Sequence, residues 1–224
     1  ESTKRFSSIY NAVNGKEADN LCLKAIHLLK KDFPTLPNVT IHLHKAIPIG
    51  AGLGGGSADA SVMLMMLNQY FSLDISTEKL MLYAAELGSD CPFFILNKPC
   101  YVTGRGENLG PIDLDLSSYQ IILVNPRIHI STQTAFAGIV PRKGTDLVRH
   151  IQEPVHTWKD HCINDFEHTV FKAYPEIEQI KKDLYQSDAI YASMSGSGST
   201  VYGIFEKTSV PRLNFPAHYF YKSV

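Results

Sequence analysis

A glycine-rich stretch in the first third of the chain has the residue types of a phosphate-binding loop. It reads Pro48-Ile49-Gly50-Ala51-Gly52-Leu53-Gly54-Gly55-Gly56-Ser57-Ala58-Asp59-Ala60 and holds five glycines within seven positions. Glycine costs backbone entropy and adds no side-chain packing, so this density indicates positive φ angles or a ligand held against bare backbone. The backbone N–H groups of such a loop, with the N-terminus of the following helix, can surround an anion, and Ser57 adds a hydroxyl donor or metal ligand.

Two better-known phosphate motifs fit this stretch less well. Gly50-x-Gly52-x-x-Gly55 matches the dinucleotide fingerprint literally, but that site requires a second strand ending in an acid, whereas Asp74 lies in a short connection to another helix. A Walker A loop requires a lysine after its last glycine, and this loop contains none. A backbone anion cradle remains, and the alternative is a plain strand-to-helix turn, which needs only one or two such glycines.

A second glycine loop, Ser195-Gly196-Ser197-Gly198-Ser199, lies near the end of the chain. The apolar stretches on either side of it, 189–193 and 200–205, are predicted strands. The loop either presents backbone N–H groups to a ligand or forms an ordinary hairpin, because Gly-Ser turns between strands are frequent.

Residues that commonly bind metals form no recognisable pattern. His42 and His44 share one face of a predicted strand, but with no third ligand in view they fit the polar face of a strand better than a metal pair. The four cysteines are scattered without a CxxC pair, which argues against a zinc ribbon and a disulfide framework. They are Cys22, Cys91, Cys100 and Cys162.

The composition is that of an ordinary globular protein. A formal net charge of −1 argues against a nucleic-acid binder, because such proteins carry a clustered excess of lysine and arginine. The most apolar run, 62–67, is far shorter than the roughly 18 residues of a spanning helix, so no membrane partner is expected. The chain lacks an initiator Met, so we expect it to begin inside a domain. The expected location is the cytosol of a bacterium, or a plastid where the missing start carries a transit peptide.

Hydrophobic periodicity predicts helices and strands in irregular alternation. The predicted helices run from an Asp19 cap to 33, from 57 to 70, from a Ser76 cap to a Gly88 stop, from a 164 or 165 cap to 174, and onward from Pro175. The predicted strands are 39–43, 93–96, 101–103, 119–124, 189–193 and 200–205. Such a mixture favours an α+β fold, with a domain boundary near 118.

The two glycine loops carry a family resemblance. Pro48 to Ala60 resembles the second motif, and Met194 to Ser199 the third motif, of the galactokinase, homoserine kinase, mevalonate kinase and phosphomevalonate kinase superfamily. The order of Asp19-Asn20-Leu21, Lys45, Leu87-Gly88-Ser89-Asp90-Cys91-Pro92-Phe93-Phe94 and Asn164-Asp165-Phe166-Glu167 around these loops is most similar to the branch that phosphorylates cytidine diphosphate-linked methylerythritol. The resemblance covers nearly the whole chain.

The resemblance implies a two-domain small-molecule kinase. The expected domains are an ATP-binding domain over 1–118, incomplete at its start, and a ferredoxin-like domain over 119–224, with ATP and the substrate meeting between them. The implied cofactors are ATP and Mg²⁺, and the partner is a small molecule. The expected activity is phosphorylation of an alcohol in non-mevalonate isoprenoid biosynthesis.

The resemblance also assigns residues to the site. Asp90 becomes the catalytic carboxylate that faces the acceptor hydroxyl, with a turn-forming aspartate as the alternative. Gly196, Ser197 and Gly198 lie on the substrate side. The implied nucleotide pocket consists of Asn20, Leu21, Lys45, Pro48, Gly50, Gly52, Leu53, Gly54, Gly55, Gly56 and Ser57. Asn20 could instead be a helix cap, Leu21 plain core, and Lys45 a solvated charge at a strand end.

Three departures from the family pattern limit the assignment. The Lys-x-Asn pattern that partners the catalytic aspartate and the Tyr-His pair that holds cytosine do not occur before the first loop, so both are expected upstream. Cys162 stands where the family often has an aromatic that stacks on cytosine, and Trp158 or His161 are the candidate substitutes. The alternatives are therefore a homoserine or mevalonate-type kinase, or a nucleotide-binding fragment without catalysis.

Overall fold

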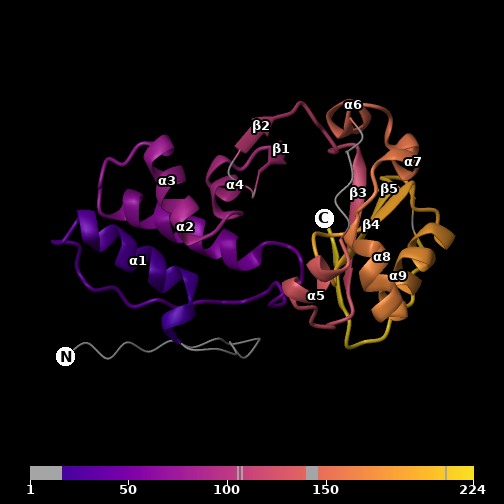
Figure 1. The fold of residues 1–224 in the computed structure, drawn as a ribbon, viewed down its shortest axis with the longest axis horizontal. Coiled ribbons are helices and arrows are strands. Elements are labelled where there is room, and N and C mark those ends of the chain that lie inside the picture. Colours follow the sequence, from indigo (N-terminus) through magenta and orange to yellow (C-terminus); the bar gives the residue numbers. More distant parts are fainter. Residues whose placement is uncertain (1–16, 105, 107, 140–145, 210) are drawn as a thin grey trace. The chain divides into compact units, whose positions relative to one another are not determined.

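The computed structural model describes residues 17–104, 106, 108–139, 146–209 and 211–224 (Figure 1). Contacts between Cα atoms divide the chain into two compact units. Of the described residues, those in 17–49 and 54–112 form one unit, and those in 50–53 and 113–224 form the other. The first glycine loop is therefore divided between them, with only Gly50–Leu53 grouped with the second unit.

The first unit is mainly helical. Its described elements are η1 (Glu17–Asp19), α1 (Leu21–Asp32), α2 (Gly55–Tyr70), α3 (Thr77–Leu87), α4 (Cys91–Leu96), β1 (Cys100–Thr103) and β2 (Asn108–Pro111). The strands β1 and β2 form an antiparallel pair in which Cys100 lies opposite Pro111. Leu29 of α1, Leu64 of α2 and Ala84 of α3 are fully buried in one apolar cluster, which holds the three helices together.

The predicted capping residues of this unit are found at α3, and the cap of α1 lies one residue later than predicted. Ser76 caps α3 by accepting a hydrogen bond from Lys79 N, and Gly88 ends the helix, both as predicted. The predicted Asp19 cap of α1 is wrong, because Asn20 is the N-cap and its Oδ1 accepts from Cys22 N at 2.9 Å.

Two predicted strands of the first unit are not strands. Residues 93–96 belong to α4, where Pro92 suits the first helical turn. The strand prediction is wrong because a short apolar run fits a helix and a strand equally well. Residues 39–43 are extended, and their side chains alternate between half-buried and exposed as predicted. They are not a strand, because none of the described residues pairs with them in a backbone ladder.

The second unit is built on a four-stranded antiparallel sheet in the order β4-β5-β3-β6. The strands are β3 (Tyr119–Asn125), β4 (Tyr191–Met194), β5 (Val201–Glu206) and β6 (Phe220–Ser223). The helices are α5 (Thr132–Ala137), α6 (Leu147–Ile151), η2 (Val155–Thr157), α7 (Trp158–His161), α8 (Phe166–Ala173) and α9 (Pro175–Gln186). This order is that of a ferredoxin-like sheet, in agreement with the predicted α+β class.

The helices α8 and α9 lie against this sheet (Figure 1). Ile177, Ile180 and Leu184 form the buried face of α9, as the periodicity predicts, and they pack with Val124 and Phe205 of the strands. Each fully buried aliphatic side chain of this kind stabilises the fold by about 1.5–3 kcal/mol. None of the helices in the described ranges is both long and apolar enough to span a membrane.

Candidate active site

The first glycine loop adopts backbone conformations that favour glycine. Gly50, Gly52 and Gly54 have φ angles of 68°, 75° and 63°. Gly54 is the N-cap of α2, and no side chain caps this helix end. The first N–H groups of an α-helix have no partner within the helix, so the start of α2 offers donors and a partial positive charge to an anion.

The two glycine loops are hydrogen-bonded to each other. Ser195 Oγ donates to Gly52 O at 2.7 Å, and Thr200 N donates to Ala51 O at 3.1 Å. A Cβ atom at Gly52 would lie 2.3 Å from Ser195 O and 2.7 Å from Gly198 O. Glycine at 52 is therefore required by the close approach of two backbone segments.

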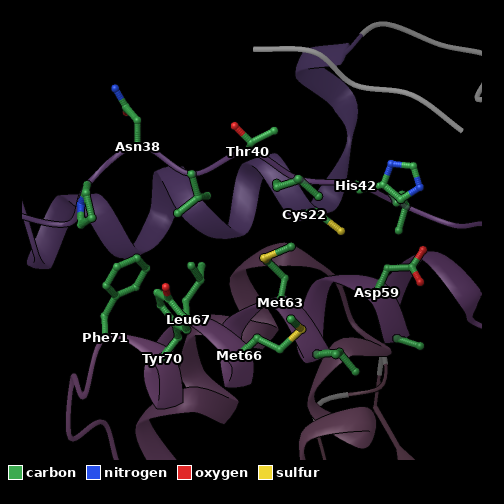
Figure 2. Close-up of a pocket in the computed structure, with 16 residues that line it drawn as sticks. Cys22, Asn38, Thr40, His42, Asp59, Met63, Met66, Leu67, Tyr70 and Phe71 are labelled. Atoms are coloured by element: carbon green, nitrogen blue, oxygen red, sulfur yellow. The ribbon is translucent and has the colours of Figure 1, made fainter. Parts of the chain in front are cut away.

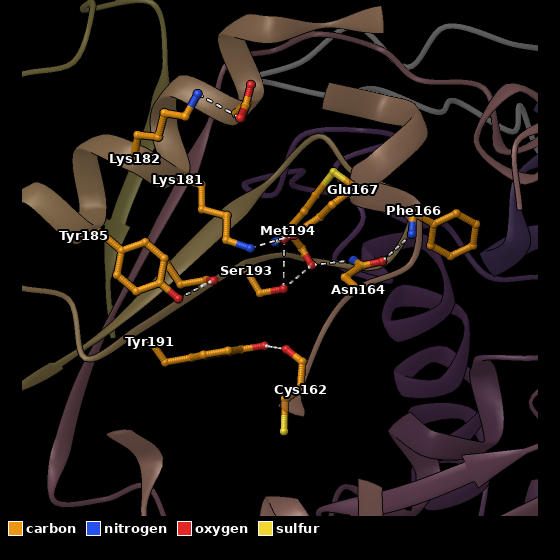
Figure 3. Close-up of polar contacts among 12 residues, drawn as sticks. Cys162, Asn164, Phe166, Glu167, Lys181, Lys182, Tyr185, Tyr191, Ser193 and Met194 are labelled. Atoms are coloured by element: carbon orange, nitrogen blue, oxygen red, sulfur yellow. Dashed lines mark hydrogen bonds and ion pairs between the residues drawn. The ribbon is translucent and has the colours of Figure 1, made fainter. Parts of the chain in front are cut away.

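A buried acid supports the second glycine loop from the side of α8 (Figure 3). Glu167 is 7% exposed, and its Oε1 accepts hydrogen bonds from Met194 N at 2.8 Å and Ser193 Oγ at 3.1 Å. Its Oε2 pairs with Lys181 Nζ at 2.6 Å. Satisfying the buried carboxylate in this way fixes the end of β4, where the loop begins.

Two asparagines hold the same loop at its ends. Asn164 Nδ2 donates to Met194 O at 2.7 Å (Figure 3) and to Gly196 O at 2.8 Å. Asn125, which is 1% exposed, donates through Nδ2 to Ser199 Oγ at 3.1 Å and to Thr200 Oγ1 at 3.0 Å. Asn125 is not among the residues predicted for the site, although a polar residue that ends an apolar strand is a usable signal.

A lysine lies next to the first turn of α2. Lys45 is 7% exposed, and its Nζ is 2.5 Å from Asp59 Oδ2. A Cβ atom at Gly55 would lie 3.5 Å from this ammonium group. Lys45 is therefore not a solvated charge at the end of a strand, and its partner Asp59 is not among the residues predicted for the site.

Asp90 lies at the N-cap position of α4 and is exposed. The next residue, Cys91, is fully buried, and burial raises the pKa of its thiol, against hydrogen bonds from the Ser57 and Ser61 hydroxyls. Ser61 Oγ is 2.8 Å from both Cys91 O and Ser57 O. These contacts fix the backbone beside Asp90 to the first turns of α2.

Comparisons with known proteins agree with this geometry. The family described as "GHMP kinases N terminal domain" matches residues 20–98, and "GHMP kinases C terminal" matches residues 153–213. The 4-diphosphocytidyl-2-C-methyl-D-erythritol kinase of Azobacteroides pseudotrichonymphae is 52% identical over 212 residues, which cover 92% of this chain and 78% of the relative. The chain belongs to the 4-diphosphocytidyl-2-C-methyl-D-erythritol kinase family.

Other relatives give the same family. The 4-diphosphocytidyl-2-C-methyl-D-erythritol kinase of Bacteroides thetaiotaomicron is 48% identical over 209 residues, which cover 92% of this chain and 76% of the relative. A crystal structure of 4-(cytidine 5'-diphospho)-2C-methyl-D-erythritol kinase aligns with a TM-score of 0.72 at 26% identity, over 91% of this chain and 74% of that one. A homoserine kinase from Cytophaga hutchinsonii, at 16% identity and a TM-score of 0.67, shares the fold alone.

Of the residues that the kinase resemblance assigned to the nucleotide, two have structural roles. Asn20 caps α1, and Leu21 packs half-buried against the core of the first unit. On the substrate side, Trp158 is 3% exposed and its Nε1 donates to Glu153 O, so its prediction as a stacking surface for a base is wrong. His161 is exposed, and its role in cytosine binding stays a prediction.

A groove of about 740 Å³ in the first unit lies next to the end of the glycine-rich stretch, where Ala58 and Asp59 line it (Figure 2). The extended segment 37–43 forms one wall and the face of α2 with Val62, Met66 and Tyr70 forms the other. Its lining is mainly apolar and does not include Asn20, Lys45 or the loop glycines. A triphosphate therefore finds better partners at the start of α2 than in this groove.

Proposed function

We propose that this chain carries the ATP-dependent phosphorylation of the 2-hydroxyl of 4-diphosphocytidyl-2-C-methyl-D-erythritol, with release of ADP. The observation that carries the proposal is the uncapped start of α2 behind three glycines with positive φ. Membership of the kinase family supports the choice of substrate. The same membership disfavours a homoserine or mevalonate-type kinase and a fragment that only binds nucleotide.

The phosphates of ATP are assigned to the first glycine loop. The backbone N–H groups of Gly54, Gly55, Gly56 and Ser57 are available at the start of a 16-residue helix, whose dipole favours negative charge. The Lys45 ammonium beside Gly55 adds a positive charge, which Asp59 holds in place. Pro48, Gly50, Gly52 and Leu53 shape the approach to this cradle, and Asn20 and Leu21 remain proposed contacts of the nucleotide.

Asp90 is assigned to the acceptor hydroxyl. Phosphoryl transfer breaks the bond between the γ-phosphorus and its bridging oxygen and forms a bond from the γ-phosphorus to the substrate oxygen, while the hydroxyl loses its proton. An exposed carboxylate, on a backbone that the buried Cys91 anchors, can orient that hydroxyl and accept the proton.

The oxygen donors near the start of α2 suit Mg²⁺. This ion prefers oxygen ligands and usually keeps several waters, so one or two protein oxygens and the substrate phosphates are enough to bind it. The Ser57 hydroxyl lies in the first turn of α2 and is half-buried. We assign Ser57 as the protein ligand, and the ion supplies neutralisation of the developing phosphate charge when it is bound.

The second glycine loop is assigned to the substrate. Gly196, Ser197 and Gly198 offer backbone N–H groups in a segment that Asn164, Glu167 and Asn125 hold rigid. Such rigidity lowers the entropy cost of binding. The proposed domains remain 1–118 for ATP and 119–224 for the substrate, and the proposed location is the cytosol, or a plastid.

A coupled assay of ADP release on the full-length protein tests the proposal. We expect turnover with 4-diphosphocytidyl-2-C-methyl-D-erythritol that depends on Mg²⁺, and little turnover with homoserine or mevalonate. Turnover of homoserine alone contradicts the substrate. ATP binding without turnover of any of the three alcohols contradicts the catalytic assignment.

A further inference from the structure

A cluster of metal-binding side chains lies in the second unit, in the helical segment formed by α6, η2 and α7. His150, Glu153 and His161 each offer one ligand atom, and these atoms all lie within 4.8 Å of one another. His150 Nδ1 is 3.2 Å from Glu153 Oε2. The rings of His150 and His161 are stacked, with centroids 4.2 Å apart and planes inclined by 11°.

Backbone contacts hold the three residues in this arrangement. Trp158, which is buried, donates from Nε1 to Glu153 O at 3.0 Å and so ties the turn after α6 to α7. Thr157 N donates to Pro154 O, and Cys162 N donates to Trp158 O. These two hydrogen bonds close the turns before and after Trp158. The ligand cluster therefore rests on an ordered segment, and only its side chains need to move.

The donor set is characteristic of a borderline transition-metal ion. Two imidazoles and one carboxylate are ligands of Zn²⁺ in sites that keep a fourth position for water, whereas Mg²⁺ and Ca²⁺ prefer oxygen alone. Tetrahedral coordination with Zn–N and Zn–O distances near 2.1 Å places ligand atoms about 3.4 Å apart. No pair of ligand atoms has to close by more than about 1.4 Å, and the two imidazole rings must turn out of their stack.

Those movements are open to the side chains concerned. His161 is exposed, while His150 and Glu153 are half-buried, so the histidine ring at the open edge is free to turn toward the other two groups. Arg149 Nε lies 3.6 Å from Glu153 Oε1, the carboxylate oxygen that does not face His150. Since the Arg149 side chain is 73% exposed, this pair is weak and leaves Oε2 to the metal.

We propose that His150, Glu153 and His161 bind one Zn²⁺ ion, with water in the fourth position. The ion links the end of α6 to the end of α7, three residues before Asn164, which holds the second glycine loop. This site has nitrogen ligands and is separate from the Mg²⁺ assignment at Ser57. Its existence does not depend on the proposed function.

The test is direct metal binding by the intact chain after treatment with a chelator. Zn²⁺ is titrated calorimetrically in excess Mg²⁺, and Co²⁺ is added in parallel because its visible absorption reports tetrahedral coordination. We expect one ion per chain and a tetrahedral Co²⁺ spectrum. His161→Gln and Glu153→Gln should each weaken Zn²⁺ binding by about 100-fold or more. Loss of a residue that only hydrogen-bonds to a metal ligand already costs about 10- to 100-fold in affinity.

His156→Gln is the matched control, because His156 is an exposed histidine of the same segment and lies outside the cluster. It should bind Zn²⁺ as the wild type does, and circular dichroism of the metal-free variants should be unchanged. Absence of a tetrahedral Co²⁺ spectrum, or equal Zn²⁺ affinity in wild type and His161→Gln, overturns the proposal. A loss of kinase activity has no bearing on this readout, so the two proposals fail independently.

Discussion

The Ser195 hydroxyl donates a 2.7 Å hydrogen bond to the carbonyl of Gly52, a residue 143 positions earlier in the chain. This bond joins two glycine loops that are separate motifs in the sequence. Because the backbones meet, the requirement for glycine at 52 comes from packing as well as from its positive φ. The two loops are thus expected to respond together to substitution.

Gly52→Ala should destabilise the fold by about 2 kcal/mol or more, because the new Cβ meets backbone oxygen at 2.3 Å and the φ angle is 75°. Urea unfolding measures the effect. Gly56→Ala is the control, since a Cβ there meets nothing closer than 3.8 Å and the helix gains about 0.5–1 kcal/mol from alanine. Equal stability of the two variants contradicts the packing argument.

Asp90→Asn should lower kcat about 10²- to 10⁴-fold and leave ATP affinity unchanged, because the amide can still fill the N-cap position of α4 but accepts no proton. Steady-state ADP release and nucleotide titration measure the two quantities. Asp74→Asn serves as control, since Asp74 is an exposed turn residue with a φ of 53° that asparagine tolerates. An unchanged kcat in Asp90→Asn removes this residue from the proposed mechanism.

Glu167→Gln should destabilise the protein by about 1–3 kcal/mol, because a buried carboxylate that accepts from Met194 N and pairs with Lys181 is replaced by an amide. The matched control is Glu178→Gln, which removes an exposed pair with Lys182 on α9 and should cost no more than about 0.5 kcal/mol. Chemical unfolding compares the two. Similar small effects at both sites argue against a supporting role for Glu167.

The Tyr83 hydroxyl donates to the Asp32 carboxylate, and burial, followed by this bond, raises the pKa of Tyr83 to about 12. A raised pKa means that the stabilisation is complete below about pH 10, the ordinary tyrosine value, and is lost as the pH rises through 12. Tyr83→Phe should therefore lower Tm at pH 8, with a difference that shrinks above pH 10.

Tyr70→Phe is the control for this experiment, because Tyr70 is 82% exposed. Its Tm should follow that of the wild type across the whole range. A difference between wild type and Tyr83→Phe that stays constant from pH 8 to pH 12 contradicts the assigned contribution of the Tyr83–Asp32 bond.

Local chemistry made several elements predictable from the sequence. The Ser76 cap and Gly88 stop of α3, and the apolar face of α9 with Ile177 and Ile180, depend on contacts within a few turns of the chain. Periodicity failed at 93–96, because a short apolar run fits a helix and a strand equally well. It also failed at 39–43, where the predicted strand has no ladder partner among the described residues, because the local sequence cannot supply one.

The sequence by itself determined the kinase family, the two glycine loops and the identity of the catalytic candidate Asp90, because these depend on residue types at short spacing. Only the tertiary structure decided which groups meet across long separations. It joined Ser195 to Gly52, placed Asp59 against Lys45, and brought His161 to His150. Such contacts arise from the packing of helices and strands, and no local pattern encodes them.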